Sequence, residues 1–420
     1  MLQSMRIEGG HRLEGTVEIS GAKNLALPAM VASLLTDQPI VLHNVPNLTD
    51  ITTMLGILEH LGSDPSCYGS DITLCTKNIV NVEAPYDYVR KMRASILCLS
   101  PLVSRCGRAR VSLPGGCAIG LRSVDLHIRT LVLMGANISI EDGFIKASAP
   151  NGLTGCEIEF PKVTVTGTEN ALMASVLAKG STRLVNVAIE PEVQEFARLL
   201  NLMGAKISGI GTSVLEIEGV EKLHGAEFNI IPDRIEAGTY AIASSLTHGK
   251  IFLKNCIYRH LQCFFTALQQ TGTTVQNRED GVLVYNNNDV IYPYCIYTDP
   301  YPAFPTDLQA QYMVLMSLCN GNATVTENLF ENRFMHVQEL IRMGANVYVD
   351  GRCARITGVQ SLKGAPVMAT DLRASVALVL AGLVAEGTTI VNRLYHIDRG
   401  YENIDNKLCA CGAVLERITQ

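Results

Sequence analysis

Tryptophan is absent from the 420-residue chain, and aromatic residues make up only 6% of it. A surface on which nucleic-acid bases stack needs aromatic side chains, so no nucleic-acid partner is expected. The chain also lacks a large excess of charge of either sign, because the formal net charge is −6 and no long acidic or basic run occurs. This balance argues against a protein that wraps a polyanion. A small anionic ligand, in contrast, would need only a local group of Arg and Lys.

Long apolar runs are missing as well. The longest, near residues 374–385, is far shorter than the roughly 18 residues that a membrane-spanning helix requires. Residues 1–12 contain no apolar segment of the signal-peptide type, so a cytoplasmic protein without a membrane span is expected. The 13 cysteines are odd in number and lack C-x-x-C spacing. We therefore expect most of them, Cys409 and Cys411 included, to be core thiols in a reducing compartment.

The signature motifs of several enzyme classes are missing too. The chain has no P-loop, no dinucleotide-binding fingerprint and no H-E-x-x-H, and its nine histidines show no metal-ligand spacing. No metal and no organic cofactor is expected.

What the chain does contain is an internal repeat. A helical segment that ends at a glycine and is followed by an extended segment recurs six times, about 70 residues apart. These glycines are Gly62, Gly135, Gly204, Gly272, Gly344 and Gly412. A second series precedes short strand-like runs, and it consists of Gly107, Gly180, Gly249, Gly321 and Gly387.

Each repeat therefore contains two helices and several strands. A glycine can adopt the left-handed conformation that ends a helix, which explains its place in the pattern. Six α+β units predict an α/β protein with two globular domains of three units each, in pseudo-threefold arrangement. A solenoid is the alternative, but repeats of this length with mixed strands and helices favour compact domains.

Two glycine-containing segments are not required by the repeat. In the first, Gly21 permits a turn that brings Lys23 and the following amides to the start of an apolar helix, which is an anion site by geometry. A solvated lysine at a turn is the simpler alternative. In the second, three glycines and a proline surround Cys117 within residues 113–120. The cations that follow, Arg122 among them, would lower a thiol pKa, but the spacing supports a reactive thiol and an incidental loop cysteine equally.

Two further patterns have competing interpretations. Asp307 lies between a proline-rich turn and a predicted helix, where a helix cap is the commoner role. Arginines recur in short phrases, most with a carboxylate within two residues, and each could form a local surface ion pair of little energetic value. Their number favours instead an arginine cluster for phosphate and carboxylate groups. The arginines are Arg93, Arg234, Arg333, Arg373 and Arg399.

Taken together and in order, these phrases resemble the UDP-N-acetylglucosamine 1-carboxyvinyltransferases, which catalyse the first committed step of peptidoglycan synthesis. The resemblance covers essentially the whole chain. It rests on the phrases at residues 21–24, 92–95, 113–117, 232–236, 304–307, 330–336, 369–374 and 395–401.

The resemblance implies an inside-out α/β barrel of two domains, each built from three βαβαββ-type repeats. One domain would comprise residues 1–20 and 232–420, and the other residues 21–231 with the cysteine loop. The active site would lie in the cleft between the domains. A monomer is the simplest expectation for the assembly.

The implied reaction moves the enolpyruvyl group of phosphoenolpyruvate to the 3′-hydroxyl of UDP-N-acetylglucosamine and releases phosphate through a tetrahedral ketal. The resemblance makes Cys117 the general acid that protonates the donor carbon and the residue that fosfomycin alkylates, and makes Asp307 the general base. Lys23 and Arg399 complete the implied catalytic set. The implied phosphoenolpyruvate-binding residues are Lys23, Asn24, Arg122, Arg333, Arg373 and Arg399. Those implied for the sugar nucleotide are Arg93, Arg122, Ser123, Val124, Asp125, Leu126, Lys162, Val163, Thr164, Val165, Arg234, Asp307 and Leu329.

The chain departs from the family pattern where Ser123 replaces a proline that lines the uracil site, and residues 163–167 are a variant run. Two rival functions remain. The shikimate-pathway enolpyruvyl transferase shares the fold and the donor, but it lacks the cysteine loop. A non-catalytic paralogue that binds UDP-sugars would show degenerate catalytic positions, and none is seen.

Overall fold

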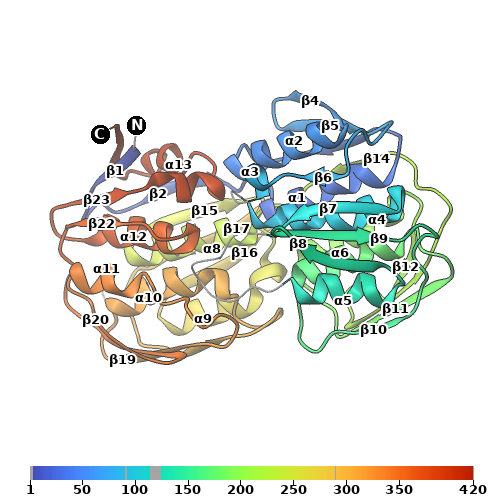
Figure 1. The fold of residues 1–420 in the computed structure, drawn as a ribbon. Coiled ribbons are helices and arrows are strands. Elements are labelled where there is room, and N and C mark those ends of the chain that lie inside the picture. The colour runs from blue at the N-terminus through green and yellow to red at the C-terminus, as the bar shows by residue number, and fades with distance from the viewer. Residues whose placement is uncertain (1–2, 90–91, 114–123, 289, 420) are drawn as a thin grey trace. The chain divides into compact units, whose positions relative to one another are not determined.

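A computed structural model describes residues 3–89, 92–113, 124–288 and 290–419 (Figure 1). The described chain forms two compact units. Unit 1 contains the residues up to Ser20 and those from Pro232 onward, and unit 2 contains the residues between Gly21 and Ile231. Each unit therefore has a hydrophobic core of its own.

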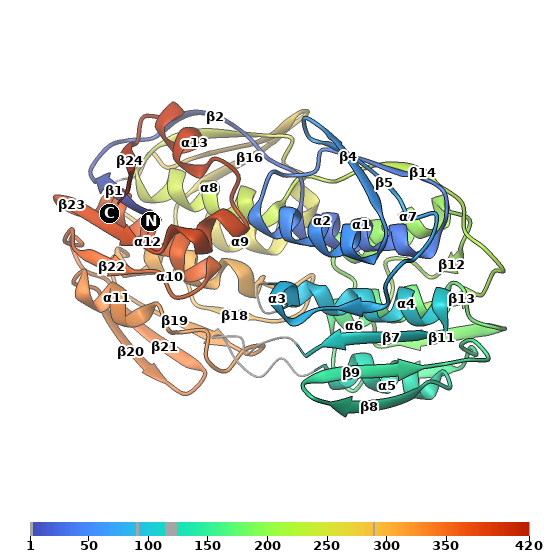
Figure 2. The same ribbon diagram turned by 45° about the horizontal axis from the view of Figure 1, so that its top comes forward.

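The described residues of unit 2 form three four-stranded sheets. In every sheet the first strand is parallel to the second, and the other neighbours are antiparallel. Figure 2 shows β7, β9 and β8 side by side in this order. The strands, in sheet order, are β14 (Ala226–Asn229), β3 (Ile40–His43), β5 (Asp71–Cys75) and β4 (Asp64–Tyr68); β6 (Glu83–Ala84), β7 (Arg108–Ser112), β9 (Phe144–Ser148) and β8 (Asn137–Glu141); β10 (Glu157–Glu159), β11 (Ser181–Val185), β13 (Val214–Glu218) and β12 (Lys206–Ser208).

Unit 1 repeats this pattern in its own three described sheets. One strand again runs parallel to its neighbour and the rest are antiparallel. The strands are β2 (Glu14–Glu18), β15 (Lys250–Lys254), β17 (Gly281–Tyr285) and β16 (Thr274–Arg278); β18 (Ile296–Thr298), β19 (Asn322–Glu327), β21 (Cys353–Thr357) and β20 (Asn346–Asp350); β22 (Pro366–Met368), β23 (Thr388–Asn392), β1 (Gln3–Glu8) and β24 (Val414–Thr419).

Strands far apart in sequence complete three of these sheets. β1 lies between β23 and β24 (Figure 2), and Met5 is paired with both Val391 and Arg417. β2 pairs with β15, and β14 closes the first sheet of unit 2 through the pairing of Phe228 with Leu42. The strands β1 and β2 near the start of the chain are therefore held in unit 1 by backbone hydrogen bonds to strands more than 200 residues later in the sequence.

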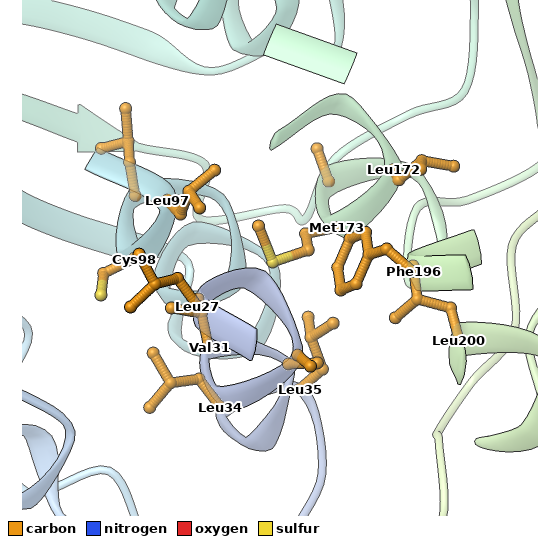
Figure 3. Close-up of a cluster of buried hydrophobic side chains, with 14 of the residues drawn as sticks. Leu27, Val31, Leu34, Leu35, Leu97, Cys98, Leu172, Met173, Phe196 and Leu200 are labelled. Atoms are coloured by element: carbon orange, nitrogen blue, oxygen red, sulfur yellow. The ribbon is translucent and has the colours of Figure 1, made fainter. Parts of the chain in front are cut away.

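Three largely buried helices lie at the centre of each unit. All nine residues of α10 are buried, as are nearly all those of α8 and α12, and these three helices contact one another. A helix that is apolar or small on every side has to be enclosed, which explains this position. Figure 3 shows the unit 2 core, where side chains from α1, η1, η2, α6 and α7 converge. The central segments are α1 (Lys23–Val31), η1 (Ala32–Leu35), η2 (Arg93–Cys98), α4 (Leu99–Cys106) and α6 (Val165–Ser175) in unit 2, and α8 (Arg234–Leu246), η4 (Thr306–Leu308), α10 (Gln309–Ser317) and α12 (Leu372–Val384) in unit 1.

The remaining helices bury only one face and end at the predicted glycines. Gly62, Gly135, Gly204, Gly272, Gly344 and Gly412 all have φ between 94° and 113°, which confirms that they end helices in the left-handed conformation. These helices are α2 (Thr49–Leu61), α5 (Asp125–Leu133), α7 (Pro191–Leu202), α9 (Gln262–Gln270), α11 (Val337–Arg342) and α13 (Ile404–Ala410). Three short segments, α3 (Tyr86–Val89), η3 (Tyr258–Leu261) and η5 (Leu394–Arg399), lie outside this series.

The second glycine series is confirmed as well, because β7, β11, β15, β19 and β23 each begin one residue after such a glycine. The reason for a glycine at position 249 differs from that at the other positions. The positive φ at this turn belongs to His248, whereas a Cβ on Gly249 would lie 2.1 Å from the Leu13 carbonyl oxygen. Glycine is required there by close backbone packing and not by the turn.

The expectation that most cysteines are core thiols is wrong for several of them. Cys98, Cys256, Cys319 and Cys411 are buried, but Cys67, Cys263, Cys295 and Cys409 are exposed. Cys409 and the C-cap residue of α13, Cys411, differ because positions two apart lie on nearly opposite sides of a helix, and α13 buries only one side. Within the described ranges, no helix combines the length and the apolar character needed to cross a membrane.

Candidate active site

Asp307 is held between two arginines in unit 1. Its Oδ1 accepts a hydrogen bond from Arg333 Nη2 at 2.6 Å, and its Oδ2 accepts one from Arg373 Nη2 at 2.8 Å. The N-cap of η4 is Pro305, so the Asp307 side chain caps no helix. The cap interpretation is therefore wrong, and the carboxylate serves as the shared partner of two guanidinium groups.

The charges at this point determine the acidity of the carboxyl group. Burial alone would raise the pKa of Asp307, but the guanidinium groups of Arg373 and Arg333 outweigh it and hold that pKa well below its usual range. Burial would likewise lower the pKa of Arg373, but the charge of Asp307 raises it. Two guanidinium groups and one carboxylate leave a net positive charge, which suits an anionic ligand.

The carboxylates that neighbour the arginines in sequence have other roles. Asp371 Oδ1 accepts hydrogen bonds from the backbone N–H groups of Arg373 and Ala374, at 2.9 and 3.1 Å, and so caps α12. Asp233 caps α8 in the same way. The alternative of local ion pairs is thus wrong for Arg333 and Arg373, whose partner lies 26 and 66 residues away.

The other arginines of unit 1 lie at element ends. Arg234 is the first residue of α8, and its guanidinium carbon is 5.8 Å from the Tyr301 ring centroid. Arg399 is the half-buried last residue of η5, while its neighbour Asp398 pairs with Arg417 at 2.8 Å.

Lys23 is the first residue of α1 in unit 2. Its Nζ lies 3.0 Å from Asp50 Oδ2 on α2, and both side chains are buried. The alternative of a solvated lysine is therefore wrong, because this ammonium group is buried and paired. Asn24 beside it is half-buried.

The sugar-nucleotide residues expected in unit 2 lie at the starts of other helices. Arg93 begins η2, Asp125 begins α5, and Thr164 caps α6 by accepting a hydrogen bond from Gly167 N at 3.3 Å. His127 on α5 is buried, and neither of its ring nitrogens has a hydrogen-bond partner among the residues that the structure describes. Burial first, and then the charge of Arg93, lowers its pKa to about 4. The other expected residues lie beside them, with Val124 and Leu126 buried, Val163 and Val165 half-buried and Lys162 exposed.

Three of the expected site residues, Cys117, Arg122 and Ser123, lie outside the described residues.

Sequence reasoning missed the groups that hold the charged side chains in place. Asp50 holds Lys23, Thr306 and Tyr401 hold the two arginines, and Glu327 orders the turn that contains Leu329 by accepting its N–H at 2.9 Å. Thr306 and Tyr401 fall within phrases that the sequence singled out. Nothing local, however, indicates that Tyr401 meets a residue on α12.

Comparisons with known proteins show the family to which the chain belongs. The family described as EPSP synthase (3-phosphoshikimate 1-carboxyvinyltransferase) matches residues 7–408. A UDP-N-acetylglucosamine 1-carboxyvinyltransferase from Granulibacter bethesdensis is 54% identical over 423 residues, and one from Methylocella silvestris is 51% identical over 428 residues. Both alignments cover 100% of this chain and of the relative.

Solved structures give the same answer for the fold. The enolpyruvyl transferase NikO from Streptomyces tendae has a TM-score of 0.91 at 25% identity, covering 100% of this chain and 99% of the other. An EPSP synthase from Acinetobacter baumannii has a TM-score of 0.77 at 15% identity over the full length of both chains, and it supports the fold alone. The resemblance seen in the sequence is confirmed: the chain belongs to the enolpyruvyl transferases of the EPSP synthase family and, within them, to the UDP-N-acetylglucosamine 1-carboxyvinyltransferases.

Proposed function

We propose that the protein transfers the enolpyruvyl group of phosphoenolpyruvate to the 3′-hydroxyl of UDP-N-acetylglucosamine and releases phosphate. This reaction is the first committed step of peptidoglycan synthesis. Among the described residues, the observation that carries the proposal is Asp307 on η4, held between Arg333 and Arg373. The full-length relatives of the chain bear the name of this activity.

The donor carries a phosphate and a carboxylate, and both need cationic partners. In the proposal, Lys23, Arg122, Arg333, Arg373 and Arg399 provide these partners, with Asn24 beside Lys23. Arginine forks bind such anions bidentately, and helix N-termini add positive partial charge. Both effects support a role for these residues in binding the two anionic groups of the donor.

Protonation of the enol carbon requires an acid, and attack by the sugar hydroxyl requires a base. The proposal assigns these roles to Cys117 and Asp307. While both arginines bind Asp307, its lowered pKa makes it a weak base. An anionic donor that engages these arginines would compete with the carboxylate for them, and the pKa of Asp307 would rise toward its usual value. Donor binding would thus prepare the base.

The residues proposed to contact the acceptor include several at helix starts. The full set is Arg93, Arg122, Ser123, Val124, Asp125, Leu126, Lys162, Val163, Thr164, Val165, Arg234, Asp307 and Leu329.

We also propose that each unit is an inside-out barrel, with residues 1–20 and 232–420 in one domain and 21–231 in the other. The buried helices α8, α10 and α12, which contact one another and pack against strands of unit 1, support this description.

Phosphate release from phosphoenolpyruvate, measured with two acceptors, tests the function. Release is expected with UDP-N-acetylglucosamine and not with shikimate 3-phosphate. Release only with shikimate 3-phosphate would refute the proposal in favour of the other family activity. Binding of the sugar nucleotide without phosphate release from phosphoenolpyruvate in the presence of either acceptor would indicate a non-catalytic paralogue.

A further inference from the structure

The two arginines at Asp307 share a second feature, which is that each gives another N–H to a buried or partly buried hydroxyl. Arg333 Nη1 donates to Thr306 Oγ1 at 2.9 Å, and Arg373 Nη1 donates to Tyr401 Oη at 3.2 Å. We propose that Thr306 and Tyr401 are positioning residues that fix the two guanidinium planes for Asp307 and for the anionic donor. The inference rests on the proposed function for the donor, but the contacts that carry it do not.

Thr306 can accept from the arginine because its own proton is committed elsewhere. Thr306 Oγ1 donates to Glu327 Oε2 at 2.8 Å. Glu327 is fully buried at the end of β19, and its other oxygen accepts the N–H groups of Leu329 and Phe330 at 2.9 and 3.1 Å. The carboxylate is thus fixed from both sides, so the hydroxyl presents its lone pairs to Arg333.

The direction of the Tyr401 hydrogen bonds follows from the donors and acceptors around its hydroxyl. Thr239 Oγ1 donates its proton to the carbonyl oxygen of Ile235 at 2.8 Å, so in its 2.8 Å contact with Tyr401 the tyrosine must be the donor. The Tyr401 oxygen then accepts from Arg373 at 3.2 Å and from Gln311 Nε2 at 3.3 Å. Burial raises the pKa of Tyr401, so the hydroxyl keeps its proton at neutral pH.

Both hydroxyls therefore act as oriented acceptors for buried cations. Only 5% of the Arg333 side chain and 7% of the Arg373 side chain is exposed, so water cannot replace a lost hydroxyl freely. A guanidinium that loses one of its two anchors can rotate about its remaining bond to Asp307. Its N–H groups would then be poorly aligned with a bound carboxylate or phosphate.

Steady-state kinetics of Thr306→Val and Tyr401→Phe test this role, because each variant removes the hydroxyl and nearly preserves the shape of the side chain. We expect the KM for phosphoenolpyruvate to rise about tenfold or more in each, as for a hydrogen bond to a charged group, while the KM for the sugar nucleotide changes little. The acid limb of the kcat/KM profile for phosphoenolpyruvate, which reports the free enzyme, should move to higher pH, because a loosened guanidinium lowers the pKa of Asp307 less. Thr306→Ser keeps the hydroxyl and should restore the wild-type KM and profile.

Matched controls separate positioning from general loss of stability. Thr271→Val removes a buried hydroxyl bonded to the Leu268 carbonyl, and Tyr312→Phe removes one bonded to the Tyr294 carbonyl. Both should destabilise the fold without changing the donor KM. If Thr306→Val and Tyr401→Phe behave like these controls, the positioning role is refuted.

A double-mutant cycle on unfolding tests the same contacts without any turnover. Thr306→Val and Tyr401→Phe should each destabilise the protein less when Asp307 is already Asn. In that background the arginine that each hydroxyl orients no longer has a carboxylate at position 307 to pair with. Additive effects would overturn the inference even in an active enzyme. Coupling in a protein that shows no phosphate release would instead refute the proposed function and leave the positioning role intact.

Discussion

Replacement of Asp307 by Asn removes one negative charge from between two arginines and leaves the shape of the side chain unchanged. The amide keeps one acceptor oxygen for one guanidinium, but it points its own N–H groups at the other. At least one buried arginine therefore loses its partner. Removal of one partner from a buried ion pair costs about 3–5 kcal/mol, and the lower end applies here because 27% of the Asp307 side chain is exposed.

A loss of about 3 kcal/mol corresponds to roughly 6–12 °C in Tm for a domain of this size. Scanning calorimetry of the wild type and Asp307→Asn at pH 7 measures it, with the exposed Asp280→Asn as the control. Added inorganic phosphate should raise the Tm of Asp307→Asn more than that of the wild type, because the unpaired arginines offer a site that binds only the folded state.

The pH dependence follows from the lowered pKa of Asp307. Its stabilisation is fully present above the unfolded-state value of about 3.9 and is lost as pH falls through the lower folded-state value. The difference in Tm between wild type and Asp307→Asn should therefore be constant from about pH 5 to pH 8 and shrink only in stronger acid. An unchanged Tm at pH 7, or a difference that grows toward low pH, would refute the assignment of Asp307 as the ionised partner of both arginines.

Three further outcomes are expected. Cys117→Ser should abolish covalent labelling by fosfomycin, and mass spectrometry that finds the label on another residue would contradict the role of this thiol. Burial raises the pKa of Glu236 to about 7. The contribution of this group to stability is therefore present below about pH 4.3 and is lost as pH rises through 7. Glu236→Gln should show a smaller fall in Tm between pH 5 and pH 8 than the wild type. Gly62→Ala should lower the unfolding free energy more than Gly135→Ala, which should cost about 1–2 kcal/mol. Both glycines have positive φ, but only at Gly62 would a Cβ lie 2.4 Å from a carbonyl oxygen. Equal losses of unfolding free energy in denaturant would show that this contact relaxes freely.

Residues that act through local backbone geometry could be predicted from the sequence. The six helix-ending glycines were predicted because a left-handed residue after an amphipathic helix has few alternatives to glycine. Strand starts after the second glycine series followed for the same reason, although Gly249 proved to be needed for close packing. The family followed from short phrases in a fixed order, and the full-length relatives confirm it.

Partners distant along the chain could not be predicted in this way. From its neighbours alone, Asp307 suggested a helix cap, and Arg373 suggested a partner in Asp371. Tertiary packing decided otherwise, because it places Asp307 on η4 beside Arg373 on α12 and gives Arg333 and Arg373 one shared carboxylate. Asp371 instead caps its own helix. The hydroxyls of Thr306 and Tyr401 acquired their direction only from the buried acceptors around them. The sequence by itself determined the repeat and the family, since both depend on local conformation and order along the chain. Only the tertiary structure decided which charges meet, since burial and distance set those energies.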